Sequence, residues 1–134
     1  RVGPARVLGA YAWRRLLNLD VPLALGSDFP VEKTDPLLGF HAAVTRQDLK
    51  GWPEGGWYSN QVMSRLEALQ GFTLGAAYAA FAEDELGSLE AGKLADFVVF
   101  DQDIMTIPGP AIPQAQVLAT FVGGRPVYQG DGLQ

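Results

Sequence analysis

The pattern of apolar residues changes at Gly87, and this change most limits the folds open to the chain. Before Gly87, apolar residues recur three to four positions apart, which is typical of helices with one buried face. After it, runs rich in β-branched and aromatic residues cover residues 95–101, 116–122 and 125–129. A Gly-Gly pair joins the last two runs and predicts a hairpin. The sequence therefore predicts an α/β chain in which a helix-rich part precedes a sheet.

Four helix signals precede Gly87. One is an amphipathic stretch, and the other three are residues whose side chains can accept a hydrogen bond from the free N–H groups at a helix start. In chain order they are residues 5–18, Asp35 before Pro36, the capping box Ser64-x-x-Glu67, and Thr73. The helix that Thr73 starts is predicted to end at Gly87 and to bury Leu74, Ala77, Tyr78 and Phe81.

The stretch P-L-A-L-G-S-D-F-P, residues 22–30, gives the clearest indication of a site. The apolar run over residues 20–26 predicts a buried strand, because Gly and Pro bound it. Asp28 follows this strand directly. Catalytic groups of parallel α/β folds lie at the carboxyl ends of strands, so Asp28 is a candidate catalytic carboxylate. The alternative is a strand-end aspartate that only caps a turn.

Composition excludes several classes of function. The 134 residues carry a net charge of −5 and no basic stripe, which argues against nucleic-acid binding. The chain has no cysteine, which excludes thiolate metal sites and fits a cytoplasmic protein. No apolar run approaches the roughly 20 residues that span a membrane. The chain begins at Arg1 without methionine, which predicts a truncated or processed start.

The chain contains a single histidine, His41, which excludes a metal site built from several imidazoles. His41 shares the apolar face of the helix that Asp35 is predicted to cap, so it is expected to be packed in the core. Lys93 and Asp96 are expected to belong to a turn that enters a strand.

Three segments together resemble the C-terminal part of a metal-dependent amidohydrolase. In particular they resemble the third amidohydrolase family, with enzymes of the N-acyl-amino-acid deacylase and imidazolonepropionase type. The segments are L-A-L-G-S-D-F-P-V with the following D-P-L-L-G-F-H-A-A-V-T-R (residues 23–31 and 35–46), S-R-L-E-A-L-Q-G-F-T-L-G-A-A-Y-A (residues 64–79), and L-G-S-L-E-A-G-K-L-A-D-F-V-V-F-D (residues 86–101).

This resemblance implies a fold and an activity. Residues 1–86 would hold the last strand–helix unit of a (β/α)8 metallo-hydrolase barrel, and residues 87–134 would add strands of a small β-sandwich. The full-length parent would be an enzyme that hydrolyses non-peptide C–N bonds of a small-molecule amide. Asp28 matches the family aspartate that is both a metal ligand and the base for the hydrolytic water. The metal would be a divalent ion, zinc by resemblance, and the chain alone is expected to bind none tightly, since the family's H-x-H motif is not present in it.

Two classes of function stay open at this point. The chain is either the C-terminal fragment of such a hydrolase, inactive by itself, or a non-catalytic structural or subunit-interaction module. The expected partners are the remainder of the parent chain or a second copy, through open strand edges, Leu23, Leu25, Trp52 and Trp57. Neither nucleic acid nor a membrane is an expected partner. The loop over residues 46–60, which begins at Arg46, either lines a substrate pocket or forms an ordinary surface or subunit contact.

Overall fold

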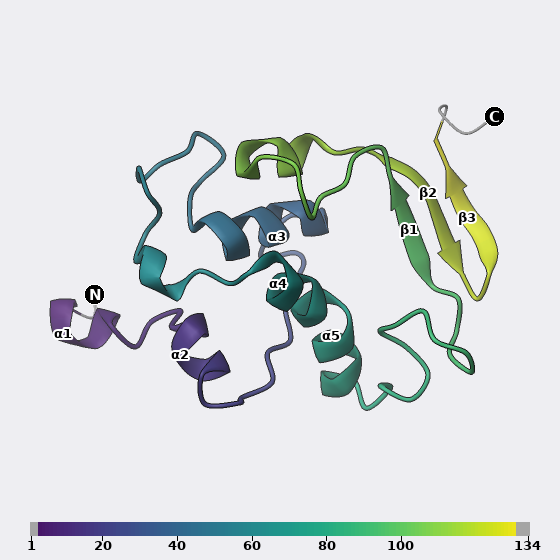
Figure 1. Cartoon of the computed structure of the whole chain (residues 1–134), viewed down its shortest axis with the longest axis horizontal. Helices are drawn as coiled ribbons and strands as arrows, with labels where there is room; N and C mark the ends of the chain where they lie inside the picture. The colour runs from purple at the N-terminus through teal and green to yellow at the C-terminus, as the bar shows by residue number, and fades with distance from the viewer. Residues whose placement is uncertain (1–2, 131–134) are drawn as a thin grey trace.

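The computed structural model describes residues 3–130 (Figure 1). A three-stranded antiparallel sheet lies at one end of the molecule, α1 and α2 lie at the other, and α3 to α5 lie between them. No helix in this part of the chain combines the length and apolar character needed to cross a membrane. With η marking a 3₁₀ helix, the elements are α1 (Gly3–Val7), α2 (Trp13–Leu17), α3 (Pro36–Thr45), η1 (Ser59–Gln61), α4 (Arg65–Phe72), α5 (Leu74–Ala79), β1 (Phe97–Phe100), η2 (Gly109–Gln114), β2 (Val117–Val122) and β3 (Arg125–Gln129).

The predicted β region is confirmed. Strand β2 is the centre of the sheet and pairs antiparallel with both β1 and β3. Gly123 and Gly124 form the hairpin turn with backbone φ angles of 56° and 74°, which residues other than glycine rarely adopt. The carboxylate of Asp96 accepts a hydrogen bond from the Gly123 N–H at 2.6 Å, so it fixes this turn. Phe97 and Phe121 stack across β1 and β2 with ring centroids 4.4 Å apart.

The main core lies where α3 meets α4 and η2. Asp35 caps α3 as predicted, and its carboxylate accepts a hydrogen bond from the Leu37 N–H at 2.9 Å. The expected packing of His41 is also confirmed, since its side chain is only 3% exposed on the buried face of α3. The buried apolar residues of this cluster are Leu37, Phe40, Ala43, Met63, Ala68, Ile112 and Ala115.

The prediction of a strand over residues 20–26 is wrong for this structure. Residues 21–27 are irregular, and among residues 3–130 all strands belong to the sheet of β1 to β3. A strand requires a neighbour that shares its ladder of hydrogen bonds. This segment instead lies against α4, where the Leu25 N–H donates to the Gly71 carbonyl at 2.9 Å. Leu23 and Leu25 are half-buried and pack against the core cluster.

The single helix predicted over residues 5–18 is divided into α1 and α2. The break is at Tyr11, whose φ angle is 51°. In a continuous helix the Arg15 N–H would donate to the Tyr11 carbonyl. Here the Tyr11 carbonyl accepts from the Arg46 side chain at 2.9 Å, and the Arg15 N–H donates to the Gln61 side chain at 3.2 Å. Partners distant in sequence have therefore replaced the helical bond.

The prediction for the helix after Thr73 is wrong in its cap, its end and its buried stripe. The Thr73 hydroxyl donates to the Leu69 carbonyl at 2.7 Å and makes no cap. Helix α5 ends at Ala79 rather than at Gly87, because Phe81 takes a left-handed conformation and Ala82 N–H donates back to Ala77 O at 3.0 Å. Within the predicted stripe only Ala77 is buried, whereas Leu74, Tyr78 and Phe81 are exposed by 38%, 55% and 93%.

The capping box of α4 is confirmed, and it also anchors α2. The Ser64 hydroxyl accepts from the Glu67 N–H at 3.2 Å, and the Glu67 carboxylate accepts from the Ser64 N–H at 2.7 Å. The same carboxylate binds both terminal nitrogens of Arg14, at 2.6 and 2.5 Å. These bonds, first of all those from Arg14, lower the pKa of Glu67 to about 2.

We expect Glu67→Gln to reduce the free energy of unfolding at pH 7 by about 1.5–3 kcal/mol, the range for hydrogen bonds to charged groups. Because the folded-state pKa is depressed, this stabilisation is present above the ordinary carboxyl pKa and is lost as the pH falls toward about 2. Urea unfolding at a series of pH values measures the difference. Glu90→Gln is the control, since Glu90 is 71% exposed and lies 3.7 Å from Lys93. A constant difference from pH 7 to pH 2 would contradict the assignment.

We expect Gly75→Ala to destabilise the chain by about 1–3 kcal/mol through overpacking. A Cβ at Gly75 would overlap the Leu23 carbonyl oxygen, which cannot move without shifting residues 21–27. This cost exceeds the roughly 0.5–1 kcal/mol that alanine gains over glycine in a helix. Gly26→Ala is the control, because no atom lies within 4 Å of its added Cβ. Equal urea midpoints for Gly75→Ala and wild type would show that the contact is loose.

Candidate functional site

The candidate site begins where residues 21–27 end. Asp28 has a φ angle of 50° and starts a tight turn, in which its carbonyl accepts from the Val31 N–H at 2.8 Å. The Ser27 carbonyl accepts from the Glu32 N–H at 3.3 Å and closes the base of the turn. The Asp28 side chain is exposed, and none of the side-chain hydrogen bonds found within residues 3–130 involves it. The turn therefore presents this carboxylate to solvent.

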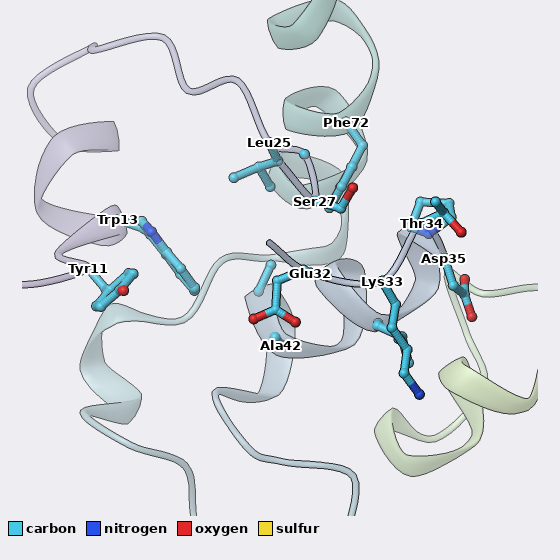
Figure 2. Close-up of a pocket in the computed structure, with 15 residues that line it drawn as sticks. Tyr11, Trp13, Leu25, Ser27, Glu32, Lys33, Thr34, Asp35, Ala42 and Phe72 are labelled. Carbon is cyan, nitrogen blue, oxygen red and sulfur yellow. The ribbon is translucent and has the colours of Figure 1, made fainter. Parts of the chain in front are cut away.

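Ser27 and Glu32, which flank this turn, line a pocket of about 580 Å³, whereas Asp28 itself is not among its lining residues (Figure 2). This volume is in the usual range for small-molecule sites. Figure 2 shows Tyr11 and Trp13 on one side of the pocket and Thr34 and Asp35 on the other. The pocket is lined by Tyr11, Trp13, Leu25, Gly26, Ser27, Glu32, Lys33, Thr34, Asp35, Pro36, Leu38, Gly39, Ala42, Ala43 and Phe72.

The wall of the pocket is largely apolar, and most of its polar side chains come from residues 27–35. Leu25, Trp13 and Phe72 come from three separate parts of the chain. The charged side chains Glu32 and Lys33 follow the Asp28 turn and are exposed. The arrangement suits a ligand with one apolar part and a polar part near the turn.

The described residues do not fit a complete catalytic metal site. Catalytic zinc sites use about three protein ligands. Within residues 3–130, no group of three or more His, Cys, Asp or Glu side chains is placed to hold a metal ion. Asp28 offers one carboxylate, so residues 3–130 could contribute this one ligand but not the full set of about three.

His41 lies elsewhere, at a smaller pocket of about 260 Å³ that Asp48 and Gln114 also line. Burial lowers the pKa of His41, and the nearby charge of Asp48 opposes this shift. The imidazole Nε2 lies 3.5 Å from the Thr45 hydroxyl oxygen. His41 therefore serves the packing of α3 against η2 and lines a pocket apart from the Asp28 turn.

The loop after α3 does not line the larger pocket. Arg46 is 6% exposed, and its guanidinium contacts Trp57 instead. Trp52 is 71% exposed at the tip of the loop, which the Asp48 carboxylate closes by accepting from the Lys50 and Trp52 N–H groups at 2.8 and 3.0 Å. The loop is therefore not a wall of the larger pocket, although its residues Asp48, Leu49 and Gly51 line the smaller one.

No pattern in the sequence marks Tyr11, Trp13 or Phe72 as pocket residues. Each lies in a predicted or observed helical region, where an aromatic side chain more often belongs to the core. Their common position depends on contacts between segments more than 50 residues apart, so no local pattern could have revealed it. The one signal that pointed to this region was the Gly-Ser-Asp sequence at the end of an apolar run.

The chain is similar to known proteins over most of its length. The model of the amidohydrolase family matches residues 1–128. Protein LONG AFTER FAR-RED 3 of Arabidopsis thaliana is 41% identical over 119 residues, which cover 89% of this chain and 20% of that protein. N-substituted formamide deformylase of Arthrobacter pascens is 32% identical over 119 residues, which cover 89% of this chain and 21% of that enzyme. The chain thus spans about a fifth of the length of these curated relatives.

The fold also has a solved counterpart. An amidohydrolase from Thermotoga maritima superposes with a TM-score of 0.66 at 21% identity, over 90% of this chain and 26% of that one. The resemblance to the C-terminal part of an amidohydrolase, which three sequence segments carried, is confirmed by these matches. This chain belongs to the amidohydrolase family.

Proposed function

We propose that the chain is part of a metal-dependent hydrolase that cleaves non-peptide C–N bonds of small-molecule amides. The observation that carries this proposal is the position of Asp28 in the turn beside the larger pocket. Family membership and a relative named as a formamide deformylase support the class of bond. The alternative of a non-catalytic module is not favoured, because the family match extends over residues 1–128.

Asp28 would serve as the base that takes a proton from the water molecule that attacks the amide. A carboxylate can accept this proton and then deliver it to the leaving nitrogen, so the amine departs in neutral form. Because the Asp28 side chain is exposed, one carboxylate oxygen could exchange this proton while the other binds a metal. In the parent protein, Asp28 would also be one ligand of a divalent metal, with zinc as the proposed ion. The other metal ligands would come from outside the described residues. We also propose that the enzyme is cytoplasmic.

We expect Asp28→Asn in the full-length enzyme to lower turnover of a small amide by at least about 100-fold, the loss typical of a general acid–base group. The amide keeps the size of the carboxylate and removes its basicity, so the fold should be retained. Steady-state kinetics, with metal content measured in parallel, tests this. Asp20→Asn is the matched control, since Asp20 is exposed at the opposite end of the same segment. Near-normal turnover of Asp28→Asn would make Asp28 a turn residue only.

We also expect the chain by itself to self-associate. Leu23 and Leu25 pack against the core of the chain, so they are not available for a contact between two copies. Trp52 remains, at 71% exposure on a loop closed by Asp48. Light scattering should show that Trp52→Ser reduces the apparent mass at a given concentration, because large aromatic residues anchor contacts. Leu89→Ser, equally exposed at 71%, is the control and should leave the mass unchanged. A monomeric wild-type chain would refute the proposal.

A further inference from the structure

Arg46 is buried at the end of α3, where it joins three segments of the chain. Its own backbone is left-handed, with φ 54° and ψ 35°, and it ends the helix. The Arg46 N–H donates to the Ala42 carbonyl at 2.9 Å, and the Arg46 carbonyl accepts from the Trp57 N–H at 2.8 Å. The side chain is 6% exposed. Arg46 therefore ends one element and fixes the loop that returns to it.

The guanidinium lies between two indole rings. Its central carbon is 4.6 Å from the ring centroid of Trp13 and 4.7 Å from that of Trp57. Nε donates to the Trp57 carbonyl at 2.5 Å, and Nη1 donates to the Tyr11 carbonyl at 2.9 Å. The Tyr11 ring also contacts both indoles edge-on, with centroids 6.2 Å apart in each case. The cation is thus held by two π faces and two carbonyl oxygens.

No carboxylate forms a salt bridge with Arg46 among residues 3–130, and its buried Nη2 makes no hydrogen bond there. Arginine keeps its charge in proteins, so the π faces and carbonyl dipoles must offset the loss of water around it. Lysine could not replace it, because an ammonium group is neither planar nor shaped to reach two carbonyls while lying flat on two rings. The site depends on the shape of the guanidinium as well as on its charge.

We propose that Arg46 is a positioning residue that holds Tyr11 and Trp13 in place as one wall of the larger pocket. Both aromatic residues line this pocket, whereas Arg46 does not. The bond from Arg46 to the Tyr11 carbonyl also ends the helical hydrogen bonding between α1 and α2, so it sets the angle at which Trp13 enters α2. The consequence for catalysis rests on the proposed function, but the placement of the wall does not.

The test uses the spectra of the tryptophans. The chain has tryptophans at 13, 52 and 57, so a Trp52→Phe background leaves only the two rings that face the guanidinium. In this background Arg46→Ala should lose most of the near-ultraviolet circular dichroism, and acrylamide quenching should increase about twofold as the rings become mobile and exposed. Ethylguanidinium, added at concentrations that do not denature the parent background, should restore both signals in Arg46→Ala. Ethylammonium should not.

Two further variants keep the proposal falsifiable. Arg46→Lys keeps the charge and the aliphatic stem, so it should fold yet show the same loss as Arg46→Ala. Arg65→Ala is the matched control, because Arg65 also donates to two main-chain carbonyls, those of Ile104 and Ile107, but faces no tryptophan. It should leave both signals unchanged. Native signals in Arg46→Lys, or equal rescue by ethylammonium, would overturn the proposal. Neither result depends on whether the parent hydrolyses amides.

Discussion

The place of the candidate site depends on how closely residues 21–27 approach α4 and α5. Two glycines allow this approach: a Cβ at Gly71 would lie 2.8 Å from Leu25 side-chain atoms, and a Cβ at Gly75 would overlap the Leu23 carbonyl. The Gly71 carbonyl then accepts a hydrogen bond from the Leu25 N–H, which sets the position of residues 21–27 relative to α4. The turn at Asp28 continues from this fixed segment, so helix packing decides where the carboxylate lies.

Two arginines, Arg14 and Arg46, hold α2 beside the pocket, and their charges are offset by different partners. Arg14 of α2 is paired with the carboxylate of Glu67, which belongs to the capping box whose N-cap residue is Ser64. Arg46 has no such partner among the described residues and lies between indole rings. The first arrangement is half-exposed and titrates with pH, whereas the second is buried and keeps its charge. Both fix α2, which carries Trp13 to the pocket.

Most features that depend on neighbours in sequence could be predicted, and features that depend on distant partners could not. The local exception is the cap expected at Thr73, whose hydroxyl donates to the Leu69 carbonyl instead. The caps at Asp35 and Ser64 and the hairpin at Gly123 and Gly124 follow from local geometry, and the structure confirms them. The break at Tyr11 could not be predicted, because it depends on a side chain 35 residues away. Asp28 could be identified from the breakers around it, but the aromatic wall beside it could not. The predicted division at residue 86 stays a prediction.

The core crosses that division, and this has a consequence for how the chain folds. Ile112, fully buried, and Ala115 follow Gly87 in sequence, yet they pack among Leu37, Phe40 and Met63 of the helical part. The helical part therefore lacks a complete core of its own until the segment between β1 and β2 has docked on it. The chain should gain its tertiary order in a single cooperative step. Recombination during evolution would accordingly have to exchange both parts together, because a new sheet would arrive without the side chains that complete the helices.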